Sequence, residues 1–81
     1  MDTRMAIALR LQSLCFSKNI TINKLANISG VSSSTLKSIL YGKSKNPGTV
    51  TIKKLCDGLN MTLGEFFSTK EFDNLEQEIK W

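Results

Sequence analysis

Residues 21–42, TINKLANISGVSSSTLKSILYG, decide the fold of this 81-residue chain. Within this stretch, two short runs of apolar residues recur at helical spacing, and Gly30 stands between them. Thr21 occupies the position that a helix N-cap requires before the first run, and Ser32 does so before the second. We therefore predict two short helices joined by a tight turn at Gly30.

Side-chain sizes in this stretch predict how the two helices pack. Ala26 is small, which suits a close helix crossing, and Gly30 allows a turn that leaves no room for a side chain. Leu25 of the first helix is expected to face a shared core with Leu36 and Ile39 of the second. This is the organisation of a helix-turn-helix unit. The face of the second helix that then points outward consists of Ser33, Ser34, Lys37, Ser38 and Tyr41.

Three further helices are expected outside this unit. Apolar residues at helical spacing, with no Gly or Pro among them, predict one helix over residues 4–17. After a turn at residues 46–48, the apolar spacing predicts a helix whose buried face is formed by Ile52, Leu55, Cys56 and Leu59. Thr62 and Glu65 have the spacing of a capping box, which predicts another helix that begins after Thr62.

The last stretch of sequence differs in charge and pattern. Phe72, Leu75 and Ile79 recur at helical spacing among four acidic residues, which predicts a short acidic amphipathic helix. No stretch of the chain alternates polar and apolar residues as a strand does. The expected architecture is therefore all-α. We predict a compact helix-turn-helix bundle of about five helices over residues 1–69, followed by an acidic amphipathic extension over residues 70–81.

Charge is distributed unevenly along the chain, whose net charge is +4. Ten basic and three acidic residues give residues 1–70 a charge of +7, whereas one basic and four acidic residues give residues 71–81 a charge of −3. Five lysines and no acidic residue lie in the stretch from Lys37 to Lys54. Such a local excess suits a phosphate backbone as partner, although a basic stretch can equally be a solvated face.

Composition argues against several other classes of protein. The chain has no histidine, and Cys15 and Cys56 form no CxxC pair, so neither a zinc site nor a disulfide framework is indicated. A nucleophile elbow and a P-loop are lacking, so we expect no enzyme, no metal and no cofactor. No apolar run is long enough for a signal peptide or a membrane span, which predicts a cytoplasmic protein without a membrane partner. No small-molecule effector is evident.

Residues 21–67, TINKLANISGVSSSTLKSILYGKSKNPGTVTIKKLCDGLNMTLGEFF, resemble the lambda-repressor-like, Cro and XRE family of regulators. The likeness begins at Ile20 and is carried by Leu25-Ala26, Ser29-Gly30-Val31, Gly42-Lys43, Asn46-Pro47 and the run from Thr62 to Phe67. It implies a compact bundle of about five helices, sequence-specific binding of double-stranded DNA and often a two-fold homodimer on a pseudo-palindromic operator. We therefore expect residues 1–69 to be the DNA-binding domain of a transcriptional regulator, most simply a repressor.

Two departures from this family bear on specificity. Many relatives carry Gln at the start of the second helix, where it touches phosphate, but this chain has Ile22, so that contact is missing here. Many also use Gln, Asn or Arg on the recognition helix, whereas this chain offers serines and one lysine. Base specificity is then expected to be modest, or to depend on bound water and on DNA shape.

We expect two sets of DNA contacts around the recognition helix, which runs from about Ser33 to Tyr41 in the major groove. A lysine ammonium can reach guanine O6 or N7, and serine hydroxyls can donate to base edges. Base contacts are therefore expected from Ser33, Ser34, Lys37 and Ser38. The resemblance puts the following loop beside the DNA backbone, and helix N-termini attract phosphate. Phosphate contacts are expected from Thr21, Ser32, Tyr41, Lys43, Ser44, Lys45, Asn46 and Thr49.

One alternative stays open at this point. Each of these polar side chains could be an ordinary solvated residue, and the bundle could serve as a protein-interaction or antitoxin-like module.

The apolar residues that exceed the needs of so small a bundle are Met5, Leu9, Phe16, Phe67, Phe72, Leu75 and Ile79. We therefore predict a two-fold homodimer formed near the fifth helix. The acidic tail should pack against apolar surface, with its charges on the side away from the recognition helix, because DNA would repel them.

Overall fold

The computed structural model describes residues 1–42 and 46–79, and over these residues all regular structure is helical. The helices are α1 (Thr3–Ser17), α2 (Ile22–Ser29), α3 (Ser33–Leu40), α4 (Thr49–Gly58), α5 (Leu63–Phe67) and α6 (Lys70–Asp73). The prediction of an all-α bundle with a helix-turn-helix unit is confirmed. Within the described ranges, no helix is long and apolar enough to cross a membrane.

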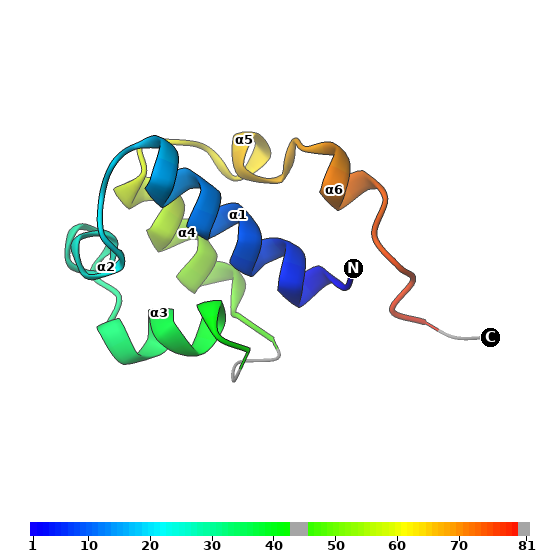
Figure 1. Cartoon of the computed structure of the whole chain (residues 1–81), viewed down its shortest axis with the longest axis horizontal. Coiled ribbons are helices and arrows are strands. Elements are labelled where there is room, and N and C mark those ends of the chain that lie inside the picture. The colour runs from blue at the N-terminus through cyan, green and yellow to red at the C-terminus, as the bar shows by residue number, and fades with distance from the viewer. Residues whose placement is uncertain (43–45, 80–81) are drawn as a thin grey trace.

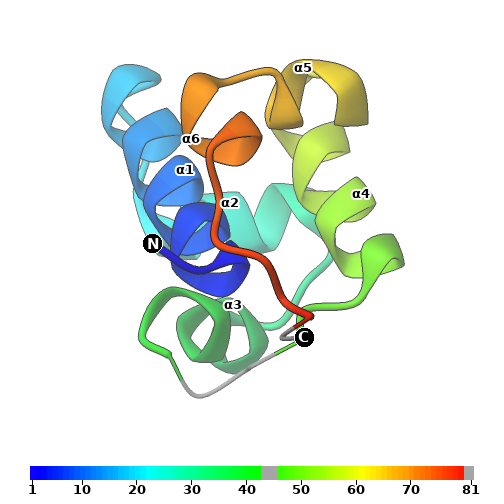
Figure 2. The same cartoon turned by 90° about the vertical axis from the view of Figure 1, so that its right-hand side faces the viewer.

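The helices surround a single core, with α3 on one side and α5 and α6 on the other (Figure 1). Figure 2 shows the same arrangement from a second direction, with α1 and α4 forming the sides between these two edges. Helix α1 packs against α3 and α6, while α2 packs against both α3 and α4, and α4 against α5. One long side of α3 is therefore left uncovered by the other helices.

The core consists of the apolar positions that the sequence pattern predicts. The largest side chains that are fully buried are those of Leu11, Leu25, Leu36, Ile39, Leu55, Cys56 and Phe66. Each such aliphatic or aromatic side chain stabilises the fold by about 1.5–3 kcal/mol relative to an exposed position. Val31, between α2 and α3, is half-buried against this cluster. The core thus ties the helix-turn-helix unit to α1, α4 and α5.

Side-chain caps fix where α2, α3 and α5 begin, as Asp2 does for α1 by accepting a hydrogen bond from Met5 N–H at 2.8 Å. The hydroxyl oxygens of Thr21 and Ser32 accept hydrogen bonds from the backbone N–H groups of Lys24 and Thr35, at 3.0 and 3.1 Å. Thr62 and Glu65 form the predicted capping box, since Glu65 N–H donates to Thr62 Oγ1 at 3.0 Å and Thr62 N–H donates to Glu65 Oε1 at 2.8 Å. The hydrogen bonds from Thr62 lower the pKa of the Glu65 carboxyl. These starts were all predictable because each cap is local in sequence.

The turn between α2 and α3 needs the backbone freedom that Gly30 supplies. Gly30 ends α2 in the left-handed region, with φ +66°, which side chains disfavour. A Cβ placed on Gly30 would have no atom within 4 Å. The glycine is therefore required by the backbone angle and not by lack of room. Gly42, with φ +86°, is likewise left-handed just after α3.

The corner between α1 and α2 is built in the same way as the corner between α4 and α5, 41 residues later. Asn19 and Asn60 have φ values of 55° and 57°, which asparagine tolerates better than most residues. The N–H of the following residue donates to the carbonyl of Cys15 in the first corner and of Cys56 in the second, both at 3.0 Å. A capping threonine comes next in each. The same local arrangement of a left-handed asparagine, a backbone hydrogen bond and a capping threonine thus forms two corners of the bundle.

Small residues bring α2 and α4 close together. A Cβ placed on Gly58 would lie 2.0 Å from Ser29 Oγ and 3.2 Å from Ser29 Cα. Ser29 is buried, and its hydroxyl has no hydrogen-bond partner among the described residues. The helix-turn-helix unit is therefore held against α4 at a distance that only glycine at position 58 permits.

The predicted amphipathic helix in the tail is wrong beyond its first turn. Helix α6 ends at Asp73, and its N-cap Thr69 makes no side-chain capping bond. A longer helix would bring Asp73 and Glu76, three positions apart, onto one face where like charges repel, and the tail gains other partners instead. Thr3 Oγ1 donates to Glu78 Oε2 at 2.8 Å, and Glu76 N–H donates to the Met1 carbonyl at 3.4 Å. The tail thus runs along the start of α1 in the same chain.

Apolar residues of this extension divide between core and surface. Phe72 packs against the core cluster and forms aromatic pairs with Phe66 and Phe67, at centroid distances of 6.0 and 4.9 Å. Leu75 is half-buried, whereas Ile79 is exposed. The predicted packing of the tail against apolar surface is therefore correct for its first part.

Candidate nucleic-acid interface

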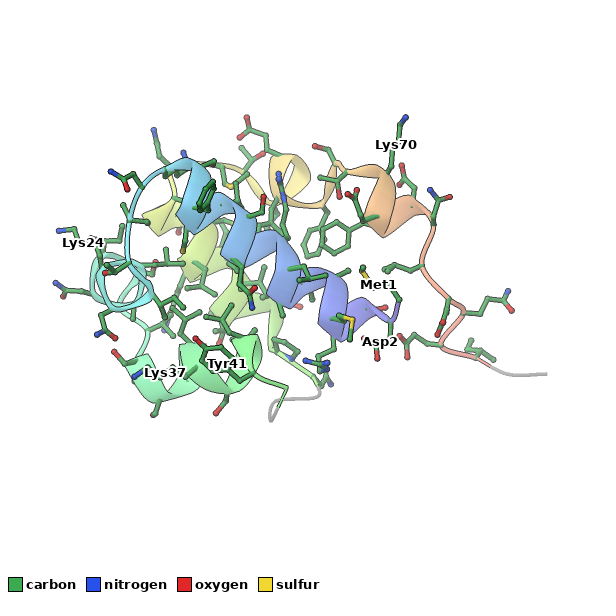
Figure 3. The ribbon with its side chains drawn as sticks, in the orientation of Figure 1. Met1, Asp2, Lys24, Lys37, Tyr41 and Lys70 are labelled. Atoms are coloured by element: carbon green, nitrogen blue, oxygen red, sulfur yellow. The ribbon has the colours of Figure 1, made fainter. Side chains whose placement is uncertain are left out.

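The outward face of α3 carries the four predicted base readers. Leu36, Ile39 and Leu40 are buried and fix the inner face of the helix. On the other side, the side chains of Ser34 and Lys37 are exposed. Ser33 and Ser38 are half-buried. The structure thus brings all four onto the uncovered part of one helix, which ends in the exposed Tyr41 (Figure 3).

Hydroxyl groups gather at the start of α3. Ser32 accepts the capping bond from Thr35 N–H, and its own hydroxyl donates to Thr35 Oγ1 at 2.8 Å. Ser34 Oγ lies 3.4 Å from Ser32 Oγ. The Ser32 hydroxyl hydrogen is thus already donated to Thr35 within the chain, so the main role of Ser32 is to cap the helix. The exposed helix start remains available to an anion.

Asn23 is part of this surface and was missed by the sequence reasoning. Ser33 Oγ donates to Asn23 Oδ1 at 3.3 Å, which links α3 to the first turn of α2 across the outer surface. Ile22, in contrast, is half-buried and packs against the core. Asn23 therefore supplies the exposed amide near the position where many relatives have Gln. Its place two residues after the capping residue Thr21 was the available signal.

Helix starts on both sides of α3 present backbone N–H groups. Thr21 is exposed at the start of α2, next to Lys24, which is also exposed (Figure 3). The start of α4 has Gly48 as N-cap, and no side chain caps it. Thr49 and Asn46 are exposed beside it. A helix start without a side-chain cap offers unpaired N–H donors and the positive end of the helix dipole.

Three predicted phosphate contacts, Lys43, Ser44 and Lys45, lie outside the described residues. The residues on either side of them can be placed. Tyr41 ends α3 and is 63% exposed, and Asn46 is exposed before Pro47. The predicted loop thus begins and ends at the surface.

Arg4 is a second residue that the sequence reasoning missed. Its guanidinium Nη1 lies 3.4 Å from the position that a Cβ on Gly42 would occupy, directly after α3. The cleft that Arg4 lines also contains Asn46 and Pro47. A single arginine near the start of a predicted helix gives no sequence signal for this placement, because only the packing of α1 on α3 brings the two segments together.

The two cysteines of the chain are buried in the core and lie away from this surface. Burial raises the pKa of the Cys15 and Cys56 thiols, so both stay protonated at neutral pH. In the part of the chain that the structure describes, no three Asp, Glu, Cys or His residues gather where they could hold a metal ion. What the surface offers is hydroxyl, amide and cationic donors on a rigid helical frame.

Comparisons with known proteins agree with this geometry. The sequence of residues 10–71 matches the family described as the Cro/C1-type HTH DNA-binding domain. The crystal structure of prophage Lp1 protein 11 has a TM-score of 0.80 and 30% identity, and the match covers 93% of this chain and 100% of that one.

A second crystal structure, of an HTH_3 family transcriptional regulator from Vibrio cholerae, has a TM-score of 0.76 and 28% identity over 86% of this chain. The match spans only 38% of that regulator. No curated protein matches the sequence. On the family match, the all-helical fold and the exposed second helix of its helix-turn-helix unit, this chain belongs to the Cro/C1-type helix-turn-helix DNA-binding domains.

Proposed function

We propose that this domain is a sequence-specific regulator of transcription that inserts α3 into the major groove of double-stranded DNA. One observation carries the proposal: α3 buries one face in the core and leaves the other, with Ser34 and Lys37 exposed, uncovered by any described helix. An α-helix fits the major groove of B-DNA, where every base pair presents a distinct pattern of donors and acceptors. Lys37 and the three serines Ser33, Ser34 and Ser38 are the proposed base readers.

Phosphate contacts on both sides of α3 would fix its register in the groove. The exposed starts of α2 and α4 flank this helix, so two sets of N–H donors can each meet one DNA strand. The proposed phosphate contacts are Thr21, Ser32, Tyr41, Lys43, Ser44, Lys45, Asn46 and Thr49. These contacts position the domain, and α3 supplies the sequence information.

Selection of bound duplexes from a random pool tests this function directly. Enrichment of one motif, with affinity that falls as salt rises, is the expected result. The selected duplex should bind more tightly than a scrambled duplex of equal length at physiological salt. Failure to bind any duplex at low salt would overturn the proposal and favour a protein-interaction or antitoxin-like role.

Repression is the direction that we propose for this regulator, because a domain bound across a promoter obstructs other proteins at the same DNA. A reporter gene placed behind the selected motif should be expressed less when the protein is present. A variant with Lys37→Ala serves as control in the same cells. Higher expression with the wild-type protein would make it an activator.

We further propose that the DNA-bound form is a homodimer. One recognition helix with four short or flexible readers covers few base pairs, and two copies about one helical turn apart double the sequence that is read. Leu9 is 44% exposed and lines a groove between α1 and α6 together with Phe72, on the side away from α3. Phe67 of α5 is 36% exposed. A second copy that packs there would leave both α3 helices free to meet DNA.

Sedimentation of the free protein and of its DNA complex tests the dimer separately from DNA binding. A dimer on the selected duplex is the expected result, and Leu9→Glu should weaken it. A strict monomer in both states would exclude the dimer while the DNA-binding proposal stands.

A further inference from the structure

The acidic C-terminal segment returns to the end of the domain where the recognition helix stops. Figure 2 shows it running from α6 across the start of α1. It is attached there by the hydrogen bond from Thr3 Oγ1 to Glu78 Oε2, 2.8 Å long, and by backbone and side-chain contacts between Glu76 and Met1. The expectation that the tail charges lie away from the recognition helix is therefore wrong for this segment.

Glu78 and Arg4 line one cleft. The other side of this cleft is formed by Gly42, Asn46 and Pro47, which follow α3 and precede α4. Arg4 is half-buried, with its guanidinium against the Gly42 backbone, and no ion pair joins it to any described residue. The cleft is thus lined by one arginine and two acidic residues, Glu78 and Asp2, together with the residues that precede and follow the loop that the proposed function assigns to the DNA backbone.

Opposite effects on a phosphate follow from these two side chains. The Arg4 guanidinium attracts a phosphate and can donate two hydrogen bonds to it, whereas the Glu78 carboxylate repels it. Charges in water act over about 8–10 Å at physiological salt, so a carboxylate in the same cleft acts at close range. Glu71 and Asp73 belong to α6, which lies at the opposite edge from α3 (Figure 1). Their charges therefore act only weakly on a phosphate at the Arg4 cleft.

We infer that Arg4 is an additional phosphate contact of this domain and that the segment from Glu76 to Glu78 opposes phosphate binding at this residue by its negative charge. This inference rests on the proposed DNA-binding function. In the free protein, the segment keeps a negative charge at the rim of the DNA surface and weakens binding to any duplex. This cost applies equally to every duplex, because phosphate contacts carry no sequence information, and a sequence with a full set of base contacts still binds in spite of it.

Charge-neutral variants of the full chain test this inference. Glu76→Gln with Glu78→Gln removes the tail charge that lines the Arg4 cleft and the one that pairs with the Met1 amino group, and Glu71→Gln with Asp73→Asn removes two charges from α6. The affinity for a random duplex is measured by fluorescence anisotropy at two salt concentrations. The first pair should tighten binding about twofold to fivefold more than the second, the range expected for exposed charge interactions.

Arg4→Gln completes the test. It should weaken binding and lower the slope of log affinity against log salt by about 0.9, as loss of one phosphate contact does. In the Arg4→Gln background, the two pairs of charge-removing substitutions should change the affinity for DNA equally, because the phosphate contact that the segment opposes is gone. Arg4→Lys should restore most of the salt slope, and thermal unfolding followed by circular dichroism checks that each variant is folded.

Three results would overturn the inference. Equal gains from the two pairs in the wild-type background would indicate only a general charge effect. If the Glu76 and Glu78 pair still gives the larger gain in affinity in the Arg4→Gln background, the segment does not act through Arg4. An unchanged slope in folded Arg4→Gln would show that Arg4 touches no phosphate. If the wild-type protein binds no duplex at all, the proposed function itself fails, which is a different outcome.

Discussion

The Arg10 guanidinium of α1 holds the end of α5, because its Nε–H donates to the carbonyl oxygen of Phe66 at 2.8 Å. A second nitrogen, Nη2, donates to the Glu65 carbonyl at 3.0 Å. The guanidinium carbon also lies 5.8 Å from the centre of the Phe66 ring. These carbonyls belong to the last turn of a five-residue helix, which has few bonds of its own.

Arg10→Met should therefore destabilise the domain, since it keeps the aliphatic stem and removes both donors. We expect a loss of about 1–3 kcal/mol in the free energy of unfolding, because charged donors to two carbonyls are removed. Chemical denaturation measures this value. Lys24→Met, which removes an exposed positive charge from α2, is the control and should change stability by less than about 0.5 kcal/mol. Equal losses in the free energy of unfolding for the two variants would show that Arg10 contributes only through its charge.

Gly58→Ala should destabilise the domain by about 1–3 kcal/mol, because the new methyl group overlaps Ser29 where α2 meets α4. Ser29→Ala alone should be neutral or stabilising, since it removes a buried hydroxyl that has no partner among the described residues. The two changes together should recover part of the loss and not all, because the Ser29 Cα stays close. Thermal unfolding of the four proteins checks this. A Gly58→Ala protein as stable as wild type would show that the helices separate easily.

Lys37→Ala should change which sequences the domain prefers. The proposed contact with guanine is worth about 1–3 kcal/mol of discrimination between bases. The measurement compares affinities for the selected duplex and for its single-base variants. Lys70→Ala removes the same charge from α6, on the far side from α3 (Figure 3), and should leave the preference unchanged. A loss that is uniform over all duplexes would make Lys37 a phosphate contact.

Replacing Lys43 and Lys45 together by Ala should lower the slope of log affinity against log salt. Each lost phosphate contact reduces the slope by about 0.9, so two contacts give about 1.8. The matched control replaces Lys53 and Lys54 of α4, which are exposed and carry the same charge. Salt titrations of duplex binding give the slopes. Equal reductions in the two double variants would contradict direct contact by the loop.

Sequence reasoning succeeded where the deciding interactions are local. The caps at Thr21, Ser32 and Thr62 each bond to a residue three positions later, so spacing alone predicted them. The outward face of α3 followed from helical periodicity in the same way. Arg4 and Asn23 were missed because their places depend on how α1 and α2 pack against α3, which no local pattern encodes.

The tail was misjudged for a related reason. Helical spacing of Phe72, Leu75 and Ile79 predicted a helix, but α6 ends at Asp73. The hydrogen bond between Thr3 and Glu78 joins residues 75 positions apart and outweighs a weak local preference. Long-range contacts of this kind leave no periodic signal in a sequence.

The repeated corner at Asn19 and Asn60 has a consequence for the folding rate. Every hydrogen bond in the two corners spans five residues or fewer, so each corner can close on the microsecond timescale of local helix formation. The slower events are then the meeting of the preformed helix pairs, above all the docking of Ser29 onto Gly58. A helical domain whose turns are set locally has a low contact order and is expected to fold in microseconds to milliseconds. Mutations at either asparagine should therefore slow refolding, because the corner is already formed when the helix pairs meet.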